Sequence, residues 1–254
     1  MNYSLITGAS SGIGFELSQK FAEEGHNLIL ISRQKNKLEQ ISVDLKKNYS
    51  VEVLIIPEDL SQPDSVDRII KVLNNNSIKI DYLINNAGFY VKGNFTETSW
   101  KEEQKLIQLQ CITHTKLTKL LIPDMLKTGK GGILNIASTG SFVSGPYNAV
   151  YCAVKSFVLS FSEAVAQELS GTGVSVTALC PGGTKTAFQQ YDKKKRSLLF
   201  PLMSASDVAK AGYKALMSGK RLAVPGMMNK IQTTLIQYLP RKLATRLAGL
   251  AVNH

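Results

Sequence analysis

The sequence has little cysteine and no long hydrophobic run. Its three cysteines, Cys111, Cys152 and Cys180, stand far apart, without a CxxC pair or a histidine-rich neighbourhood. This spacing argues against a disulfide framework and against a metal site of the zinc type. No stretch approaches about 18 consecutive apolar residues, so a membrane-spanning helix is not expected, and no secretory signal opens the chain. These absences favour a reducing, cytoplasmic setting.

Acidic residues are also scarce. The 19 Asp and Glu stand against 30 Lys and Arg, which gives a formal net charge of +11. The positive residues are scattered apart from the cluster 193–196, and no basic stripe with interleaved aromatic residues occurs. We therefore expect no nucleic-acid partner and interpret most of the excess as solvated surface charge. With 254 residues, 44% of them hydrophobic, the chain can bury a large core.

Short apolar runs alternate with amphipathic stretches through the chain, which is typical of βαβ units that build a parallel sheet. Several runs, such as 28–31, are apolar at every position, as expected where helices cover both faces of the sheet. We predict a single domain over 1–254, an α/β fold with a Rossmann-type doubly wound parallel sheet. The expected strands are Tyr3–Thr7, Asn27–Ser32, Val51–Ile56, Tyr82–Asn85, Ile133–Ala137, Val174–Leu179 and Leu222–Val224.

Local signals mark several helix ends. Gly25 is placed to close the first helix, Pro63 with Asp64 to open the third, and Ser204 with Asp207 to form a capping box. The irregular segment 186–203 is a candidate substrate loop, because long irregular inserts in compact domains are usually functional.

A glycine-rich turn stands between the first expected strand and helix. Gly8 permits a tight turn, Gly12 lets the backbone approach a pyrophosphate, and Gly14 lets the helix pack closely on the strand. The N–H groups of the helix N-terminus would then face the phosphates. The spacing GxxxGxG differs from the commoner GxGxxG, and the turn also contains Ser10, Ser11 and Ile13.

About 20 residues further on, a dinucleotide fold places the residue that meets the adenosine ribose, and an acid there binds the 2′-OH of NAD. This chain has Ser32 and Arg33 instead. A guanidinium forms charge-assisted hydrogen bonds with a 2′-phosphate, which a carboxylate would repel. The expected cofactor is NADP(H); a solvated surface arginine is the alternative interpretation.

Tyr151 and Lys155 are four residues apart at the head of an apolar helical stretch and so share a helix face. A protonated Lys155 near Tyr151 is expected to favour the phenolate and to lower a pKa that starts near about 10, making the tyrosine a proton donor and acceptor near neutrality. Ser138 directly follows an expected strand, at the sheet edge where ligands bind in such folds.

These motifs together resemble those of the short-chain dehydrogenase/reductase family, and the C-terminal part is most similar to its DltE-like branch. The resemblance extends over nearly the whole chain. It implies that Tyr151 exchanges a proton with the substrate oxygen, that Lys155 also holds the nicotinamide ribose, and that Ser138 hydrogen-bonds the carbonyl. It also implies cofactor contacts, and the matching residues are Ile13, Asp59, Asn86, Ala87, Gly88, Pro181, Gly182, Thr184 and Thr186. Asp59 could alternatively be a helix cap, and Asn86 could brace strand ends.

One position departs from the family pattern. The family usually has an asparagine that holds a proton-relay water where this chain has Gln110. Glutamine carries the same amide one methylene further out, so the relay persists with a shifted geometry or is impaired.

The sequence thus predicts an oxidoreductase that transfers hydride between NADP(H) and a hydrophobic ketone or aldehyde, or its alcohol. Reduction of a 3-oxoacyl thioester, with the cluster 193–196 receiving an acidic carrier, is the alternative reaction. An NADP(H)-sensing regulatory protein with little turnover, suggested by Gln110, is the alternative from another class. The resemblance implies a homodimer or homotetramer. Candidate substrate-pocket residues are Phe89, Tyr90, Val91, Phe95, Phe142, Val143, Tyr147, Phe188, Tyr191, Leu199 and Phe200.

The C-terminal extension 229–254 carries an apolar stripe at helical spacing, which Pro240 breaks into two short helices. The stripe consists of Ile231, Leu235, Leu239, Leu243, Leu247 and Leu250, and it is flanked by Lys230, Arg241, Lys242 and Arg246. This pattern suits an anionic membrane surface, but packing over the substrate pocket or against a neighbouring subunit is the favoured interpretation.

Overall fold

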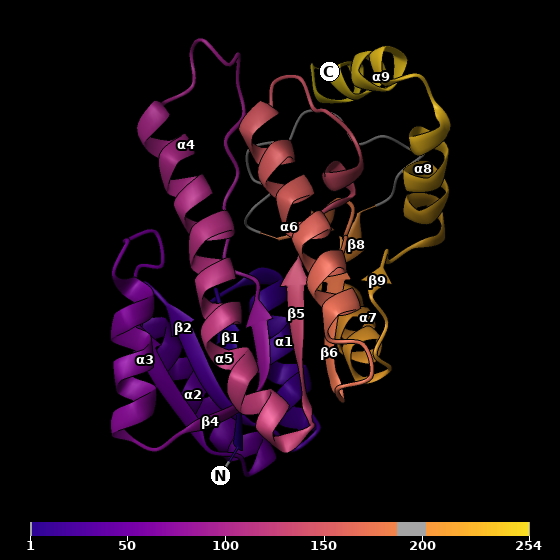
Figure 1. Ribbon diagram of the computed structural model, residues 1–254. Coiled ribbons are helices and arrows are strands. Elements are labelled where there is room, and N and C mark those ends of the chain that lie inside the picture. The colour runs from indigo at the N-terminus through magenta and orange to yellow at the C-terminus, as the bar shows by residue number, and fades with distance from the viewer. Residues whose placement is uncertain (1, 187–201, 254) are drawn as a thin grey trace.

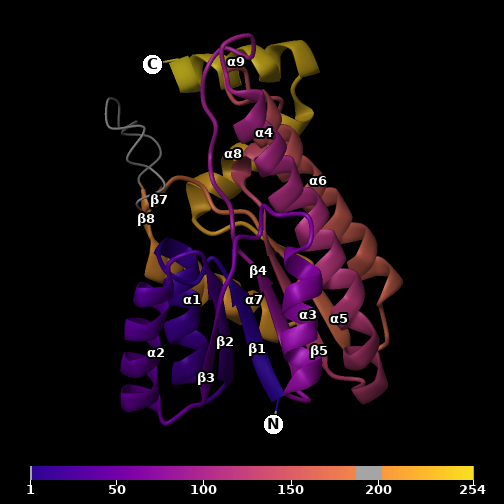
Figure 2. The same ribbon diagram turned by 90° about the vertical axis from the view of Figure 1, so that its left-hand side faces the viewer.

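One parallel sheet organises the chain (Figures 1 and 2). A computed structural model describes residues 2–186 and 202–253. The sheet has the strand order β3-β2-β1-β4-β5-β6-β9, and all six of its neighbouring pairs are parallel. Its strands are β1 (Asn2–Thr7), β2 (Asn27–Ser32), β3 (Val53–Pro57), β4 (Lys79–Asn85), β5 (Gly131–Ile136), β6 (Val174–Leu179) and β9 (Leu222–Ala223). The order reverses direction between β1 and β4, which confirms the predicted doubly wound fold.

Helices cover both faces of this sheet. They are α1 (Gly12–Glu23), α2 (Lys35–Tyr49), α3 (Ser65–Asn75), α4 (Trp100–Ile107), α5 (His114–Thr128), α6 (Ala149–Glu168) and α7 (Ala205–Met217). Figure 2 shows α1 and α2 on one side of the sheet and α3, α5 and α6 on the other. Two large apolar cores result, and β2 contributes to both: Leu28 and Leu30 join the core under α1, α2 and α7, whereas Ile29 and Ile31 join the one on the opposite face. This alternation explains why the strand is apolar at every position.

The helix-end signals are confirmed in part. Gly25 follows α1 with a φ of +80°, the left-handed conformation that suits glycine. Asp64 is the N-cap residue of α3, but its side chain caps no N–H group and pairs with Arg68 instead. The Ser204 hydroxyl accepts a hydrogen bond from the Asp207 N–H at 3.0 Å and donates to the Asp207 carboxylate, so only half of the expected capping box forms.

The observed strands differ from the expected ones in where they begin and end, because strand ends carry no strong local signal in the sequence. β3 begins at Val53, two residues late, and β5 begins at Gly131, two residues early. Two short strands that the sequence did not predict, β7 (Thr184–Lys185) and β8 (Met203–Ser204), pair in parallel. They flank residues 187–201, so most of the candidate substrate loop 186–203 lies outside the described residues.

Among the described residues, only α6 is long and apolar enough by composition to cross a membrane. It packs against β6 and carries two polar side chains, Tyr151 and Lys155, into the cavity described below. These features are those of a core helix.

The C-terminal extension forms α8 (Met227–Tyr238) and α9 (Arg241–Asn253), separated at Pro240 as predicted. Packing of its apolar stripe over the substrate pocket, one of the two interpretations favoured from the sequence, is wrong, whereas packing against a neighbouring subunit stays a prediction. Leu235 and Leu247 are 61% and 45% exposed, and neither helix lines the large cavity.

Candidate active site

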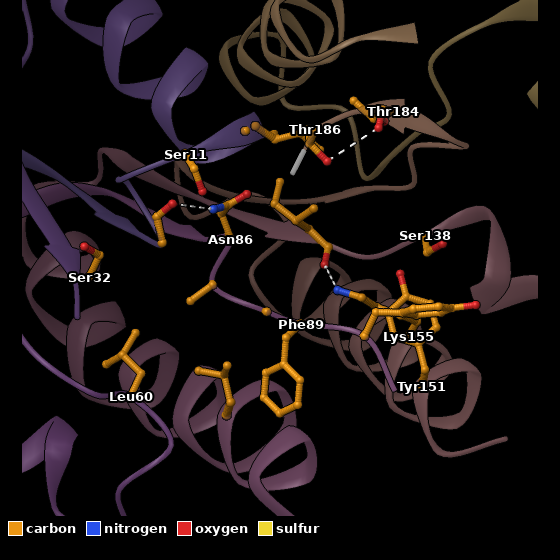
Figure 3. A pocket seen from close by; sticks show the side chains of 18 of the residues that line it. Ser11, Ser32, Leu60, Asn86, Phe89, Ser138, Tyr151, Lys155, Thr184 and Thr186 are labelled. Carbon is orange, nitrogen blue, oxygen red and sulfur yellow. Dashed lines mark hydrogen bonds between the residues drawn. The ribbon is translucent and has the colours of Figure 1, made fainter. Parts of the chain in front are cut away.

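A cavity of about 620 Å³ lies at the carboxyl ends of the strands (Figure 3). The residues that follow β1, β2, β3, β4, β5 and β6 all contribute to its wall, together with the first two turns of α6. In a doubly wound sheet this edge, next to the strand-order reversal, is where ligands bind. Nearly all of the predicted site residues line it: Gly8, Ser10, Ser11, Gly12, Ile13, Arg33, Asp59, Asn86, Ala87, Gly88, Ser138, Tyr151, Lys155, Pro181, Gly182, Thr184 and Thr186. Gly14 and Gln110 do not.

The glycine-rich turn has the backbone that its sequence suggests. Gly8 and Gly12 adopt φ angles of +67° and +57°, which L side chains rarely tolerate. A Cβ at Gly14 would lie 2.3 Å from the Gly8 carbonyl oxygen, so Gly14 sits behind the turn and permits close packing. Ser11, the N-cap residue of α1, makes no side-chain capping hydrogen bond. The first N–H groups of the helix are therefore left to bind an anion at the cavity wall.

Asn86 fixes this turn to the end of β4. Its side-chain amide donates to the Thr7 carbonyl oxygen at 2.9 Å, and the Thr7 hydroxyl accepts hydrogen bonds from the Asn86 and Ala87 N–H groups at 2.9 and 3.0 Å. Asn86 thus braces the strand ends, the alternative considered for it from sequence, while it still lines the cavity.

The charged residues at the expected ribose end differ in how they are neutralised. Glu58 is held by Arg68 through two hydrogen bonds of 2.8 Å, and this pairing lowers the pKa of Glu58. Burial favours a higher pKa for Asp59, but hydrogen bonds from the N–H and hydroxyl of Ser61 outweigh it and keep the pKa low. Arg33 is exposed and forms no ion pair with any described residue. It is therefore available to an anionic ligand.

The opposite end of the cavity holds Ser138, Tyr151 and Lys155 (Figure 3). Lys155 is 4% exposed, and its Nζ donates to the Ile136 carbonyl oxygen at 2.7 Å. The Ser138 side chain hydrogen-bonds Tyr151. The segment that carries Ser138 is tied to α6 by Ser141, whose hydroxyl donates to the Lys155 carbonyl oxygen at 2.8 Å. Three side chains from two segments therefore converge at one point.

The pKa expected for Tyr151 is wrong for the protein by itself. Burial raises it to about 12, and the hydrogen bond with Ser138 opposes this only partly. Burial also lowers the pKa of Lys155 to about 8. The Lys155 ammonium lies 5.8 Å from the centre of the Tyr151 ring and is directed to the Ile136 carbonyl, so it does not stabilise a phenolate. Near neutral pH, Tyr151 is a protonated phenol, ready to donate.

Gln110 lies behind the cavity wall, in the π-helical stretch η1 (Gln108–Thr113) between α4 and α5. It is fully buried, and neither atom of its amide has a hydrogen-bond partner among the described residues. A Cβ at Gly88 would lie 2.4 Å from the Gln110 Nε2, so the Gln110 amide lies directly against the Gly88 backbone in the loop after β4. One turn later His114 is also buried, and burial, with the nearby Lys155 charge, lowers its pKa to about 3. The sequence analysis did not predict this buried, neutral histidine, because no motif marks it.

Only part of the expected aromatic pocket is at the site. Phe89 and Tyr90 line the cavity, and the Tyr90 ring meets that of Tyr151 edge to face at 4.9 Å. The Tyr90 hydroxyl donates to Asn148 at 2.7 Å, a contact not foreseen. Phe95 is 66% exposed and Phe142 packs on a small core, so neither lines the cavity, and nor do Val91, Val143 and Tyr147. The remaining candidates, Phe188, Tyr191, Leu199 and Phe200, lie outside the described residues.

The chain is similar to known proteins in both sequence and fold. Residues 2–197 match the family described as short chain dehydrogenase. The chain is 31% identical over 213 residues to the ketoacyl reductase HetN of Nostoc sp., covering 84% of this chain and 74% of that protein. A short-chain dehydrogenase from Sphingobium yanoikuyae in complex with NADPH superposes with a TM-score of 0.82 at 28% identity, over 94% of this chain and 96% of that one. The bulky-bulky ketone specific alcohol dehydrogenase from Comamonas testosteroni gives 0.79 at 26% identity, over 95% and 96%.

Proposed function

The chain belongs to the short-chain dehydrogenase family and is an oxidoreductase of that type, and from this premise we propose that it transfers hydride between NADP(H) and a hydrophobic ketone or aldehyde, or the corresponding alcohol. One observation carries the proposal. Ser138, Tyr151 and Lys155 converge at one end of a cavity whose other end is a glycine turn at a helix N-terminus. A hydride carrier with phosphates and a carbonyl substrate fit these two ends.

The residues present suit a nicotinamide dinucleotide. The free N–H groups at the start of α1 would hold its pyrophosphate, and Pro181, Gly182 and Thr184 would face its nicotinamide end. When bound, the cofactor supplies the hydride that the protein itself lacks. The protein's contribution is to orient the reactants and to move a proton.

NADP(H) is favoured over NAD(H) by the charges at the ribose end. Arg33 lines the cavity and has no ion-pair partner among the described residues, while the nearby Glu58 is neutralised by Arg68. A 2′-phosphate would therefore meet an available guanidinium.

The catalytic roles follow from the geometry and the pKa values. Ser138 would donate a hydrogen bond to the substrate carbonyl oxygen, and Tyr151, a protonated phenol near neutral pH, would deliver the proton to that oxygen. Lys155, with a pKa lowered to about 8, is still largely protonated near neutral pH and would donate hydrogen bonds to the nicotinamide ribose. Phe89 and Tyr90 give the substrate side an apolar surface.

Reduction of a 3-oxoacyl thioester is the second candidate, because the similar Nostoc protein is named a ketoacyl reductase. The basic cluster expected to receive its carrier, 193–196, lies outside the described residues. The non-enzymatic alternative, an NADP(H) sensor, depends on Gln110 and is opposed by the arrangement of Ser138, Tyr151 and Lys155.

We also propose that the protein acts in the cytoplasm as a homodimer or homotetramer. Exposed apolar residues on α6, on η1 and on the adjoining α5 support an interface there: Phe157 is 42%, Ile112 51% and Leu120 45% exposed. Light scattering on the purified protein would test this, and a monomer at all concentrations would refute it.

A turnover assay tests the proposed function. Bulky ketones, aldehydes and 3-oxoacyl thioesters are each offered with NADPH and with NADH. We expect turnover of at least one hydrophobic carbonyl and a preference for NADPH. Equal efficiency with NADH would refute the role of Arg33, and cofactor binding without turnover of any carbonyl would favour the sensor.

A further inference from the structure

The helix α8 turns polar side chains toward the protein and large apolar side chains toward the solvent. Its inward residues include two polar side chains, Asn229 and Thr233, which are 9% and 4% exposed and hydrogen-bonded. Its large apolar residues point the other way: Met227 is 70%, Leu235 61% and Tyr238 83% exposed. A helix that only packs on a soluble core shows the opposite arrangement.

The helix α9 repeats this pattern. The small residues Ala244 and Gly249 are buried, and a Cβ at Gly249 would lie 3.1 Å from the Pro146 ring. Leu243, Leu247 and Leu250 are 43%, 45% and 51% exposed. Packing on small residues brings α9 close to the protein while its leucines remain outside. We call the outward side of α8 and α9 the C-terminal face.

The charge of this face has one sign. Lys230, Arg241, Lys242 and Arg246 are exposed, and none of them forms an ion pair with a described residue. No Asp or Glu follows Asp207 in the sequence. Apolar residues interleaved with unpaired basic ones are the composition of helices that lie in the interface of an anionic bilayer.

The C-terminal face lies at the same end of the molecule as the start of α4, as both views show (Figures 1 and 2). That start and the loop before it add two exposed aromatic residues, Trp100 and Phe95, each 66% exposed. The cavity lies at the carboxyl ends of the strands, which point toward this end of the molecule. The helix α8 also packs against the short helix η2 (Thr139–Phe142), which Ser138 caps. The exposed apolar surface therefore adjoins the catalytic end of the cavity.

We propose that the C-terminal face docks on an anionic membrane surface. A second copy of the chain is the poorer occupant, because a two-fold contact through this face would bring eight unpaired basic residues together without an acidic one. An anionic bilayer satisfies both features, since it accepts the apolar side chains and neutralises the basic ones. Docked in this way, the cavity's catalytic end lies near the lipid, where hydrophobic carbonyl compounds concentrate.

Vesicle sedimentation of the full chain tests the proposal. The probes are vesicles of phosphatidylserine mixed with phosphatidylcholine, and vesicles of phosphatidylcholine alone. We expect salt-sensitive pelleting with the anionic vesicles and little with the neutral ones. The triple variant Arg241→Gln, Lys242→Gln, Arg246→Gln should bind the anionic vesicles on the order of 100-fold more weakly, and Leu235→Ser on the order of tenfold more weakly.

Matched controls lie on α2, which is far from α8 and α9 in both views. Lys37→Gln, Lys46→Gln and Lys47→Gln remove the same net charge from exposed positions. Val43→Ser matches Leu235→Ser, since Val43 and Leu235 are each 61% exposed. These controls should pellet like the wild type, and turnover of a soluble carbonyl should be unchanged in every variant.

Three results would overturn the proposal. One is absence of pelleting by the wild type, and another is equal loss in the α2 controls, which would show a response to net charge alone. The third is a wild-type oligomer that Leu235→Ser, but not Val43→Ser, dissociates in light scattering, since the face would then be occupied by a second copy.

Discussion

The two ends of the cavity are built by different means. The end with the glycine turn is made largely of backbone: positive φ angles at Gly8 and Gly12, and the N–H groups at the start of α1. The end with Tyr151 and Lys155 is made of side chains, one of them nearly fully buried, with pKa values moved by burial. A backbone site binds any ligand of the right shape and charge, whereas a side-chain site performs one chemistry and bears the energetic cost of burying its groups. Substitutions should therefore affect the two ends differently.

The largest effect is expected at the side-chain end. Tyr151→Phe keeps the ring but removes the transferable proton, so turnover should fall by roughly 10² to 10⁴ while NADPH affinity changes little. Tyr90→Phe is the matched control, because its ring contacts Tyr151 and its hydroxyl bonds Asn148 instead. Steady-state kinetics and a cofactor titration measure both quantities. Near-normal turnover in Tyr151→Phe would assign the acid role to another group.

At the end with the glycine turn, the preference between the two cofactors should depend chiefly on the charge at position 33. Arg33→Asp removes the partner of the 2′-phosphate and adds repulsion, which should cost about 1.5 to 3 kcal/mol of the preference for NADPH, or roughly 10-fold to 150-fold. The ratio of kcat/KM for the two cofactors measures this change. Lys37→Asp makes the same charge change on the exposed part of α2 and should leave the ratio intact. An unaltered ratio in Arg33→Asp would mean that Arg33 is ordinary surface charge.

Burying Lys155 should lower the free energy of unfolding of the protein. Burial lowers the Lys155 pKa from 10.5 to about 8, so between these pH values the unfolded chain holds a proton that the folded chain has released. The free energy of unfolding therefore rises with pH through that window, and below it the full penalty is present. Lys155→Met should gain on the order of 1 to 3 kcal/mol near neutral pH, and less as the pH rises.

Denaturant unfolding of both forms at several pH values would measure this gain. Lys37→Met, at an exposed position, serves as the control. Turnover and cofactor affinity of Lys155→Met should both fall, because the variant loses the hydrogen bonds proposed between Lys155 and the nicotinamide ribose. A variant less stable than the wild type at every pH would contradict the argument.

The smallest effect is expected at Gln110, which supports the side-chain end from behind. If its amide holds the relay water, Gln110→Asn should preserve or raise turnover, and Gln110→Leu should lower it by about 2-fold to 10-fold. Gln110→Leu should stay folded, since the amide atoms it removes have no partner among the described residues. Equal rates in all three forms would show that the position is bypassed, and would remove the basis of the sensor alternative.

The sequence predicted the fold well because its signals are local and repeated. Every long strand was placed to within a few residues, and Pro240 separated the two C-terminal helices where expected. Nearly all of the predicted site residues line the cavity for a similar reason, because residues that follow parallel strands necessarily meet at one edge. The short strands β7 and β8 and the π-helical stretch at Gln110 were missed, because neither has a local pattern of its own.

By itself, then, the sequence determined which residues stand at the strand ends and which side chains share a helix face. Only the tertiary structure decided their surroundings. Burial raised the pKa of Tyr151, against the expectation drawn from its spacing to Lys155, and the same apolar stripe that predicted packing for α8 and α9 faces solvent. Helical spacing shows that residues lie on one side, but not what that side meets. Solvent exposure and electrostatic environment are sums over groups that are distant in the chain, and these become neighbours only when it folds.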